Sequence, residues 1–517
     1  MNWTTTRPGT ALRMTIALLA GAAFVAALPP LALAPLAPLA FAALFAALHG
    51  LRPGAAFAVG WAFGLGQFAV GVSWIAESFF VDAERFAALA LPAVAGLAAG
   101  LALFSALAGW LHAVLLRWRV LPGLAGAALL LATTWTAAEW LRGHLLTGFP
   151  WNLTGYALAE TPALRQPAAW VGSYGLGFLL VLAGALIGAA LLARGRARLW
   201  PAGLAVALVA AVWAAGNWRL DGAAPPQTGT SLRIVQGNIP QAEKWAPGSR
   251  EKSLAKYLRL SAQPGEYDLL LWPETAYPGY LDEDAQARGR IAASLPEGAY
   301  LLTGAPDRVQ GQAGARYFNT LQAYDRQGDI LTGYAKHHLV PFGEYVPWRA
   351  WLPLPRIVQS MGDFTPGPGP RTLALPGLPL VAPAICYEII FPGHVTDRLF
   401  RPDWIFNATN DAWFGTSIGP VQHLTAARFR AVEEGLPVIR AANTGISAVI
   451  DARGRVLARR ALETDGVIDA ALPPALPRTA YARFRDWMLA GLVGGTLAVA
   501  LIAVHGLPAV RRRRCGG

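Results

Sequence analysis

LPLVAPAICYEIIFPG, residues 378–393, is the stretch that decides the fold of the polar part of the chain. Residues 378–385 form an apolar run that is typical of a buried strand. Cys386 follows directly, and Phe391-Pro392-Gly393 predict a turn that leads into a helix. A reactive group at a strand end is typical of α/β folds.

Strand-like runs of the same kind recur on both sides of this stretch. They cover residues 232–239, 267–272, 300–304, 320–324, 404–409, 438–441 and 447–451. Helical patterns lie between several of them, at 250–262, 284–295 and 421–434. This alternation predicts one large α/β domain over residues 218–485.

The rest of the chain has a different composition. Of all 517 residues, 54% are hydrophobic and 14% are charged, whereas a soluble protein carries roughly 25% charged residues. Apolar stretches that approach the ~20 residues of a membrane span lie at 11–28, 31–48, 54–74, 90–116, 122–141, 168–193, 199–217 and 487–507. The sequence therefore predicts a polytopic α-helical membrane protein with about eight transmembrane helices: seven spans in residues 1–217, and one in residues 486–517 before a basic tail.

The positive charge follows the apolar stretches. Residues 218–485 hold 28 Lys and Arg against 25 Asp and Glu, so +9 of the formal net charge of +12 belongs to the membrane part. With the N-terminus inside, the outer loops carry only Arg85, Arg142 and Arg165, and the inner segments carry Arg7, Arg13, Arg52, Arg117, Arg119, Arg194, Arg196, Arg198 and Arg511 to Arg514. This asymmetry predicts cytoplasmic termini and an extracytoplasmic α/β domain. The basic charge therefore does not indicate a nucleic-acid partner.

Although Arg7 and Arg13 before an apolar run resemble a signal peptide, the spans that follow directly favour a retained first helix.

Three polar residues of the α/β part stand out because each follows a strand-like run: Glu274, Lys336 and Cys386. Each has an ordinary explanation, since a free cysteine is usually a small buried hydrophobe and a single acid or lysine is usually structural. Cys515 is the only other cysteine, which excludes a disulfide framework and a Cys-rich metal site. The other lysines lie in or near a polar, helical surface region: Lys244, Lys252 and Lys256.

Together, the three residues suit acyl transfer. A carboxylate can take the proton of a thiol and later return it to a leaving group, and a nearby cation lowers the pKa of the thiol. An ammonium can also stabilise the oxyanion of a tetrahedral intermediate, where losing one donor costs about 3–4 kcal/mol. Serine-elbow, zincin and Walker A motifs are missing from the sequence. His337, His338 and His423 lack metal-site spacing, so we interpret them as structural.

These residues belong to longer motifs that resemble a known family. Trp-Pro-Glu at 272–274, a lysine before the next block and Cys-Tyr-Glu at 386–388 resemble the nitrilase superfamily with its Glu-Lys-Cys triad. The match is tighter to the bacterial apolipoprotein N-acyltransferases. It rests on QGNIP (236–240), WPETA (272–276), LVPFGEYVP (339–347), ICYE (385–388), NDAWFG (410–415) and ANTGIS (442–447), with GFPW (148–151) in the membrane part.

The resemblance, which covers nearly the whole chain, implies an α-β-β-α catalytic domain and a set of site residues. Cys386 corresponds to the nucleophile, Glu274 to the general base and Lys336 to the oxyanion partner. The family's supporting residues correspond to Glu344, Tyr387 and Glu388. Substrate or lid positions correspond to Trp245, Trp348 and Trp351, and we expect the apolar loop around the last two to dip into the outer leaflet.

The resemblance also implies the reaction and its partners. An acyl chain passes from a membrane phospholipid, expected to be phosphatidylethanolamine, to Cys386 as a thioester. It then passes to the α-amino group of the diacylglyceryl-cysteine at the N-terminus of an apolipoprotein. No metal or cofactor is needed, a monomer suffices, and the expected location is the bacterial inner membrane with a periplasmic catalytic domain.

Two alternatives remain open at this point. A membrane-tethered nitrilase or amidase that acts on a small C–N substrate shares the triad, but it does not need eight spans. A transporter or receptor is disfavoured because ionisable residues inside the spans are few. Only Glu139 and Arg142 qualify, and both lie near the outer end of their helix.

Overall fold

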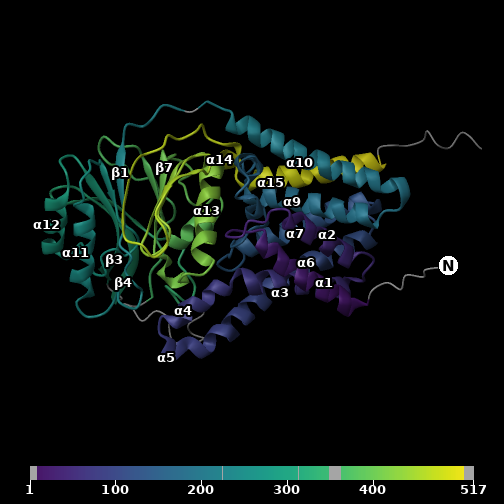
Figure 1. The fold of residues 1–517 in the computed structure, drawn as a ribbon, viewed down its shortest axis with the longest axis horizontal. Helices are drawn as coiled ribbons and strands as arrows, with labels where there is room; N and C mark the ends of the chain where they lie inside the picture. The colour runs from purple at the N-terminus through teal and green to yellow at the C-terminus, as the bar shows by residue number, and fades with distance from the viewer. Residues whose placement is uncertain (1–8, 224, 312–313, 348–362, 506–517) are drawn as a thin grey trace, which may run out of the picture. The chain divides into compact units, whose positions relative to one another are not determined.

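The computed structural model describes residues 9–223, 225–311, 314–347 and 363–505, which form parts of two compact units. The first unit contains Met1–Ser73, Ala93–Asp221 and Arg483–Gly517, and the second contains Trp74–Pro92 and Gly222–Ala482. Figure 1 shows the helices of the first unit and the sheets of the second. The segment Trp74–Pro92 thus packs with the α/β part, although it lies between two apolar helices in the sequence.

The described part of the first unit is built from apolar helices. Five helices are long and apolar enough to cross a membrane: α3 (Pro53–Gly71), α6 (Ala90–Arg117), α7 (Gly123–His144), α9 (Ala168–Leu192) and α10 (Leu199–Leu220). Three apolar helices have shorter qualifying stretches: α1 (Thr10–Ala26), α2 (Leu36–Leu48) and α15 (Asp486–His505). These helices occupy the eight apolar stretches of the sequence, which confirms the expected helical membrane part.

Glycines let α1 and α3 approach closely. A Cβ atom at Gly21 would lie 1.9 Å from the carbonyl oxygen of Phe63, and one at Gly66 would lie 2.0 Å from that of Leu18. Small residues at helix contacts are the usual packing device in membranes, where van der Waals contact replaces the hydrophobic driving force. Any larger residue at these two positions would push the helices apart.

The charged pair on α7 makes contacts within the first unit. Oε1 of Glu139 accepts hydrogen bonds from the backbone N–H of Thr154 at 2.8 Å and from Arg142 at 3.4 Å. Arg142 also donates to the carbonyl oxygen of Trp151 at 2.9 Å. The pair therefore holds the loop after α7 in place, and this structural role weakens the transporter alternative.

The described part of the second unit holds two sheets. The six-stranded sheet has the order β11-β1-β2-β3-β4-β5, with β1 (Ser231–Gln236), β2 (Leu269–Leu271), β3 (Tyr300–Gly311), β4 (Gly314–Tyr324), β5 (Ile330–Ala335) and β11 (Gly466–Ala471). The five-stranded sheet has the order β10-β9-β8-β7-β6, with β6 (Val381–Ile385), β7 (Trp404–Thr409), β8 (Val438–Ala442), β9 (Ala448–Ile450) and β10 (Val456–Arg459). Strands β1 to β3 are parallel, as are β6 to β8, and the outer strands are antiparallel.

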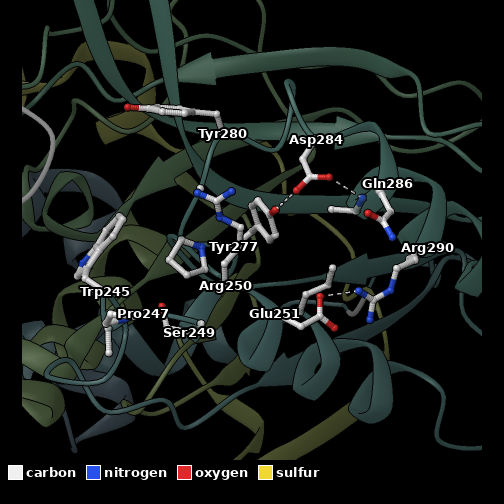
Figure 2. Close-up of a pocket in the computed structure, with 16 residues that line it drawn as sticks. Trp245, Pro247, Ser249, Arg250, Glu251, Tyr277, Tyr280, Asp284, Gln286 and Arg290 are labelled. Atoms are coloured by element: carbon white, nitrogen blue, oxygen red, sulfur yellow. Dashed lines mark hydrogen bonds and ion pairs between the residues drawn. The ribbon is translucent and has the colours of Figure 1, made fainter.

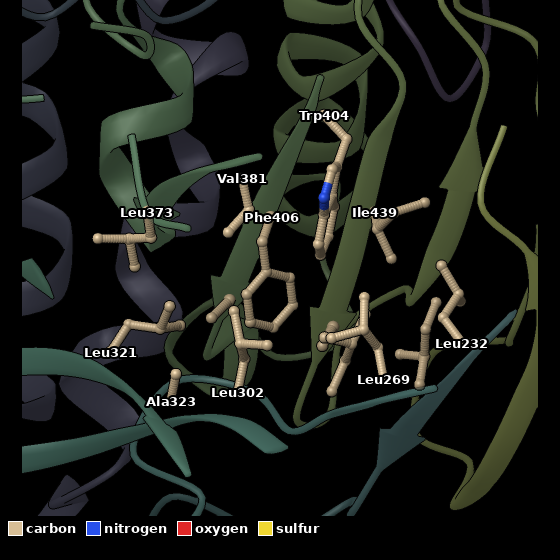
Figure 3. Close-up of a cluster of buried hydrophobic side chains, with 14 of the residues drawn as sticks. Leu232, Leu269, Leu302, Leu321, Ala323, Leu373, Val381, Trp404, Phe406 and Ile439 are labelled. Atoms are coloured by element: carbon tan, nitrogen blue, oxygen red, sulfur yellow. The ribbon is translucent and has the colours of Figure 1, made fainter. Parts of the chain in front are cut away.

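Apolar side chains of the two sheets face each other. Leu269 and Leu302 of the first sheet belong to one buried cluster with Phe406 and Ile439 of the second (Figure 3). The other face of the first sheet packs under α11 (Ser249–Ser261) and α12 (Ala285–Ser294). Helix α13 (Gly419–Glu434) contacts β8 of the second sheet (Figure 1). The layers are therefore α-β-β-α, as expected.

Replacing Ile439 with Val tests the tightness of this core. Ile439 is fully buried between the sheets, so losing one methylene is expected to cost about 0.5–1.5 kcal/mol of unfolding free energy. Thermal unfolding of the full chain in detergent measures this loss. The matched control is Ile330→Val on β5, where the side chain is 44% exposed. Equal losses for both variants would contradict the assignment of this core.

The prediction of a helix after residues 391–393 is wrong. Strand β6 ends at Ile385, a 3-10 turn follows over Cys386–Ile390 (η5), and the chain reaches β7 through turns and bends. The carboxylate of Glu388 accepts a hydrogen bond from the backbone N–H of Ile385 at 2.7 Å. This bond curls the chain back on itself immediately after the strand, which leaves Cys386 at the turn.

Candidate active site

Glu274, Lys336 and Cys386 lie together where three strands end. Glu274 follows β2, Lys336 follows β5 and Cys386 follows β6, and all three are buried. Nζ of Lys336 lies 3.6 Å from Oε1 of Glu274. The charges of both residues act on the thiol of Cys386. The two stacked sheets thus bring these three residues together, although the first and the last are more than a hundred positions apart in the sequence.

The carboxylate of Glu274 is held at both oxygens. Oε1 accepts a hydrogen bond from Nδ2 of Asn319 at 2.8 Å, and Oε2 accepts one from the backbone N–H of Asn410 at 2.9 Å. Gly304 lets the backbone of β3 lie close to the backbone of Glu274, because a Cβ atom at Gly304 would lie only 2.6 Å from the Cα of Glu274. The carboxylate is therefore oriented before any substrate arrives.

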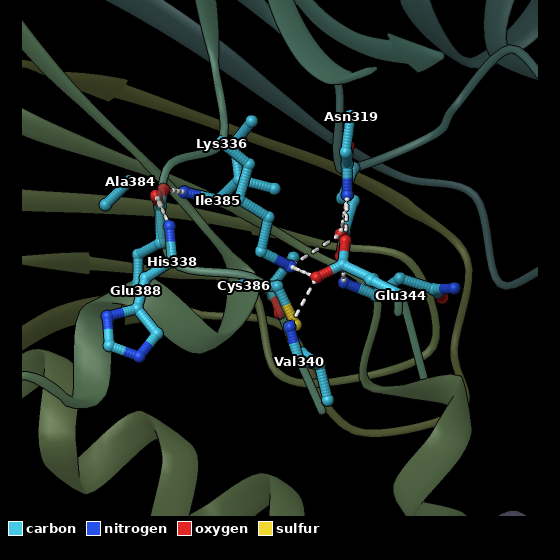
Figure 4. Close-up of polar contacts among 12 residues, drawn as sticks. Asn319, Lys336, His338, Val340, Glu344, Ala384, Ile385, Cys386 and Glu388 are labelled. Carbon is cyan, nitrogen blue, oxygen red and sulfur yellow. Dashed lines mark hydrogen bonds and ion pairs between the residues drawn. The ribbon is translucent and has the colours of Figure 1, made fainter. Parts of the chain in front are cut away.

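Glu344 holds the ammonium of Lys336. Oε2 of Glu344 lies 2.9 Å from Nζ of Lys336 and accepts a hydrogen bond from the backbone N–H of Val340 at 2.7 Å (Figure 4). Oε1 accepts one from Asn319 at 2.8 Å. Asn319 therefore bridges Glu344 and Glu274. Sequence reasoning missed it, because a single polar residue within a strand has no local signature.

Two carboxylates keep Lys336 charged. Burial lowers the pKa of its ammonium, but the negative charges of Glu344 and Glu274 outweigh burial and raise the pKa above its usual value. Lys336 therefore remains a cation throughout the physiological range. This is the state needed to stabilise a developing negative charge on a substrate oxygen.

The backbone of Cys386 has a left-handed conformation, with φ of 50°. A non-glycine residue in this region costs about 1–3 kcal/mol, and such strain is common at functional sites. Burial and the charge of Glu274 raise the pKa of the thiol, whereas Lys336 opposes them. The thiol is therefore protonated at rest and needs a base to become a nucleophile.

A buried ionic network lies behind Cys386. Its carbonyl oxygen accepts a hydrogen bond from Nε2 of His423 at 3.1 Å. Nδ1 of His423 lies 2.8 Å from Oδ1 of Asp411, and Arg440 donates to Oδ2 of Asp411 at 2.6 Å. Ligand atoms of Cys386, Asp411 and His423 lie within 4.8 Å of one another, but the guanidinium of Arg440 already provides the positive charge there. This arrangement favours a supporting network over a metal site.

Glu388 joins the two segments that carry Lys336 and Cys386. Its Oε1 accepts hydrogen bonds from the hydroxyl of Tyr334 at 2.7 Å and from the backbone N–H of His337 at 2.8 Å, while Oε2 binds β6 as described above. Burial raises the pKa of Glu388, but the side chain of His337, whose Nδ1 lies 2.6 Å from Oε1, outweighs burial together with the hydrogen bonds from Tyr334 and Ile385 and lowers it. Glu388 thus stays an anion that ties β5 to β6.

The remaining residues expected from the sequence differ in their placement. The ring of Tyr387 packs against those of Phe391 at 5.1 Å and His338 at 5.8 Å. Trp245 is 37% exposed and lines a cavity of about 610 Å³ with Tyr277 and Arg250 (Figure 2). Trp348 and Trp351 lie outside the described residues.

The interpretation of Lys244 as a surface residue is wrong. Its side chain is 1% exposed, and Nζ donates a hydrogen bond to the backbone oxygen of Glu274 at 3.2 Å. The polar residues around it in the sequence suggested solvent, but the chain turns inward between Gln241 and Trp245. No local pattern of residues indicated this turn.

The segment Trp74–Pro92 packs on the loop that follows β7. The rings of Trp74 and Phe414 lie 4.5 Å apart, and the hydroxyl of Ser78 donates to the carbonyl oxygen of Trp413 at 3.0 Å. Because this loop begins with Asn410, which binds Glu274, the segment supports one wall of the site.

Comparisons with known proteins agree with this geometry. The family model of the apolipoprotein N-acyltransferase N-terminal domain matches residues 20–186, and the model of the carbon–nitrogen hydrolases matches residues 231–481. The apolipoprotein N-acyltransferase of Bradyrhizobium diazoefficiens is 43% identical over 97% of this chain and 95% of its own. That of Rhodopseudomonas palustris is 42% identical over 95% of each. Among solved structures, an amidase from Nesterenkonia sp. is 18% identical and covers 52% of this chain and 98% of its own, with a TM-score of 0.36. The chain therefore belongs to the apolipoprotein N-acyltransferase family, a bacterial membrane protein family with a carbon–nitrogen hydrolase domain.

Proposed function

We propose that this chain transfers an acyl chain from a membrane phospholipid to the α-amino group of the diacylglyceryl-cysteine at the N-terminus of apolipoproteins. The observation that carries the proposal is the buried cluster of Glu274, Lys336 and Cys386 in a chain with eight apolar helices. A thiol, a base and a fixed cation are what acyl transfer needs. The apolar helices suit substrates that never leave the bilayer.

In the first half-reaction, the proton of the Cys386 thiol moves to Glu274. The thiolate attacks the ester carbonyl carbon of the phospholipid, and the ammonium of Lys336 stabilises the oxyanion that forms. The C–O bond of the ester then breaks, and Glu274 gives its proton to the departing oxygen. The products are a lysophospholipid and a thioester on Cys386.

In the second half-reaction, the neutral α-amino group of the apolipoprotein attacks the thioester carbonyl carbon. Glu274 accepts the proton that the nitrogen loses, and the C–S bond breaks. Glu274 then returns the proton to the sulfur, which regenerates the thiol. The product is an amide, so the lipoprotein carries three acyl chains.

Neighbouring residues have supporting roles in this proposal. Glu344 keeps Lys336 aimed at the site, and Glu388 fixes the strand ends that carry Lys336 and Cys386. Tyr387 lines the site beside the nucleophile. Trp245 serves as a lid residue; its place next to Lys244, whose side chain contacts the backbone of Glu274, supports this role. Trp348 and Trp351 contact the lipid substrate.

The arginine asymmetry supports a location for this reaction. Residues 1–217 and 486–517 anchor the chain in the bacterial inner membrane with both termini in the cytoplasm, and residues 218–485 form a periplasmic catalytic domain. The enzyme acts as a monomer, with phosphatidylethanolamine as the acyl donor. It requires no cofactor, because base, nucleophile and cation all come from the chain.

The acyl-enzyme is tested by intact-mass spectrometry. Purified protein incubated with phosphatidylethanolamine is expected to gain the mass of one acyl group. Hydroxylamine should remove this mass, and a diacylglyceryl peptide with a free α-amino group should discharge it. The variant Cys386→Ala should gain no mass, whereas the control Cys515→Ser should behave as the wild type.

The competing activity is hydrolysis of a small amide, which the same triad could perform with water. It predicts ammonia release from a small amide without phospholipid. If lipid binds but no acyl adduct forms, and ammonia is released, the acyl-transfer proposal is wrong.

A further inference from the structure

Lys244 is a second buried lysine at the site. It lies on the short segment before α11, and its Nζ donates to the backbone oxygen of Glu274 at 3.2 Å. The same segment is tied to the site by Gln241, whose Oε1 accepts a hydrogen bond from Nδ2 of Asn410 at 2.7 Å. Asn410 in turn donates its backbone N–H to Glu274. The position of Lys244 is therefore set by the residues that orient the base.

The charges at the site do not balance without Lys244. Glu274 and Glu344 provide two negative charges, and Lys336 provides one positive charge. A buried charge without a partner is costly, and Lys244 supplies the fourth charge. Moving the proton from Cys386 to Glu274 neutralises the carboxylate and turns the thiol into a thiolate. The negative charge moves from Glu274 to Cys386, and the total charge does not change. The charges of Glu274, Glu344, Lys336, Lys244 and Cys386 thus sum to zero before and after the thiolate forms.

The ammonium of Lys244 has a lowered pKa but is still protonated at neutral pH. Burial lowers the pKa of its ammonium to about 8, and the charges of Glu274 and Cys386 oppose this effect. The titratable groups that act on the thiol from the surrounding elements are Glu274, Lys336 and Asp411. Of these, only Lys336 favours the thiolate. The charge of Cys386 in turn acts on the ammonium of Lys244, so Lys244 is a second cation that can favour it.

We propose that Lys244 is a positioning residue for acyl transfer, whose ammonium stabilises the Cys386 thiolate and whose hydrogen bond holds the backbone of Glu274. This inference rests on the proposed function, since it assigns the thiolate as the reacting species. It differs from the role of Lys336, because Lys244 has no carboxylate partner of its own among the contacts described above. Its ammonium can therefore stabilise the carboxylate of Glu274 before the proton transfer and the thiolate of Cys386 after it.

The test measures the ionisation of the thiol without any lipid substrate. The full chain in detergent carries Cys515→Ser, so that Cys386 is its only cysteine. The rate of alkylation by iodoacetamide is followed from pH 6 to 11 by intact mass. Lys244→Met is expected to slow alkylation about tenfold below pH 8, where the wild-type ammonium is present; this factor corresponds to a thiol pKa higher by about 1. At higher pH the two profiles should converge. Lys252→Met, at an exposed position of α11, is the matched control and should leave the profile unchanged.

Two further variants separate charge from structure. Lys244→Gln keeps a hydrogen-bond donor for the backbone of Glu274 but removes the charge, so it should raise the pKa of the thiol as Lys244→Met does. Lys244→Arg keeps the charge and should restore the wild-type alkylation rate below pH 8. These comparisons also decide the case if Lys244→Met fails to fold.

An alkylation profile of both uncharged variants that matches the Lys252→Met control would overturn the proposal and leave Lys244 a structural residue. Because the assay uses no lipid, its result is independent of the acyl-adduct experiment. A missing adduct together with a shifted thiol profile would contradict the proposed function and leave the role of Lys244 intact.

Discussion

Glu274→Gln is expected to slow acyl-enzyme formation by a factor of about 10²–10⁴, the usual contribution of a positioned general base. The amide keeps the shape of the side chain but cannot accept the proton of Cys386. It also removes the charge that faces Lys336 at 3.6 Å. Because the raised pKa of the thiol keeps it protonated at neutral pH, no other route to the thiolate compensates for the missing base.

The rate of the acyl mass gain measures this effect, and its pH dependence identifies the cause. At alkaline pH, the thiol ionises without help, so the difference between variant and wild type should narrow. The control is Glu266→Gln, at an exposed position before β2, which should acylate at the wild-type rate. Acylation of the Glu274→Gln variant within tenfold of wild type at neutral pH would show that Glu274 is not the base.

Asp411→Asn is expected to destabilise the chain by about 3–5 kcal/mol, the typical cost of breaking one side of a buried ion pair. Asp411 and Arg440 are both fully buried. Asn is nearly isosteric with Asp, so the main loss is the charge that pairs with Arg440 at 2.6 Å. The cationic guanidinium of Arg440 then remains in the core without its carboxylate.

Thermal unfolding in detergent measures this loss, which corresponds to a midpoint lower by roughly 10 °C. The control is Glu283→Gln, which breaks an ion pair with Arg308 whose partners are 46% and 42% exposed. Such exposed pairs contribute less than about 1 kcal/mol. A loss for Asp411→Asn no larger than that of the control would contradict the assigned network.

The same variant has a predictable pH dependence. Burial acts to raise the pKa of Asp411, but Arg440 and His423 outweigh burial and lower it below its usual value. A carboxyl whose pKa is lower in the folded chain than in the unfolded chain stabilises the fold at pH values above its unfolded-state pKa, near 3.9. That stabilisation disappears as the pH falls toward the folded value. The stability difference between Asp411→Asn and wild type should therefore shrink in acid.

Local patterns in the sequence predicted the layers but not every strand. The edge strands β10 and β11 were not among the predicted runs, because their side chains are partly exposed and form no apolar run. Apolar stretches near spanning length predict membrane helices because the bilayer requires a minimum length. The buried strands were also predictable, since buried parallel strands such as β6 and β7 are short apolar runs. The strand-end positions of Glu274, Lys336 and Cys386 follow from the same runs. The turn after β6 was not predictable, because the carboxylate of Glu388 determines it.

By itself, the sequence determined the two kinds of segment in this protein, the buried strands of its α/β part and the three residues of the candidate triad. These features depend on patterns of neighbouring residues, over at most the ~20 positions of a membrane span. Only the tertiary structure decided how the site is held: Asn319 between two carboxylates, Asp411 behind the nucleophile, and Lys244 turned into the core. Each of these contacts joins residues that are distant in the sequence. Their energies come from burial and charge pairing, which exist only after the two sheets have packed together.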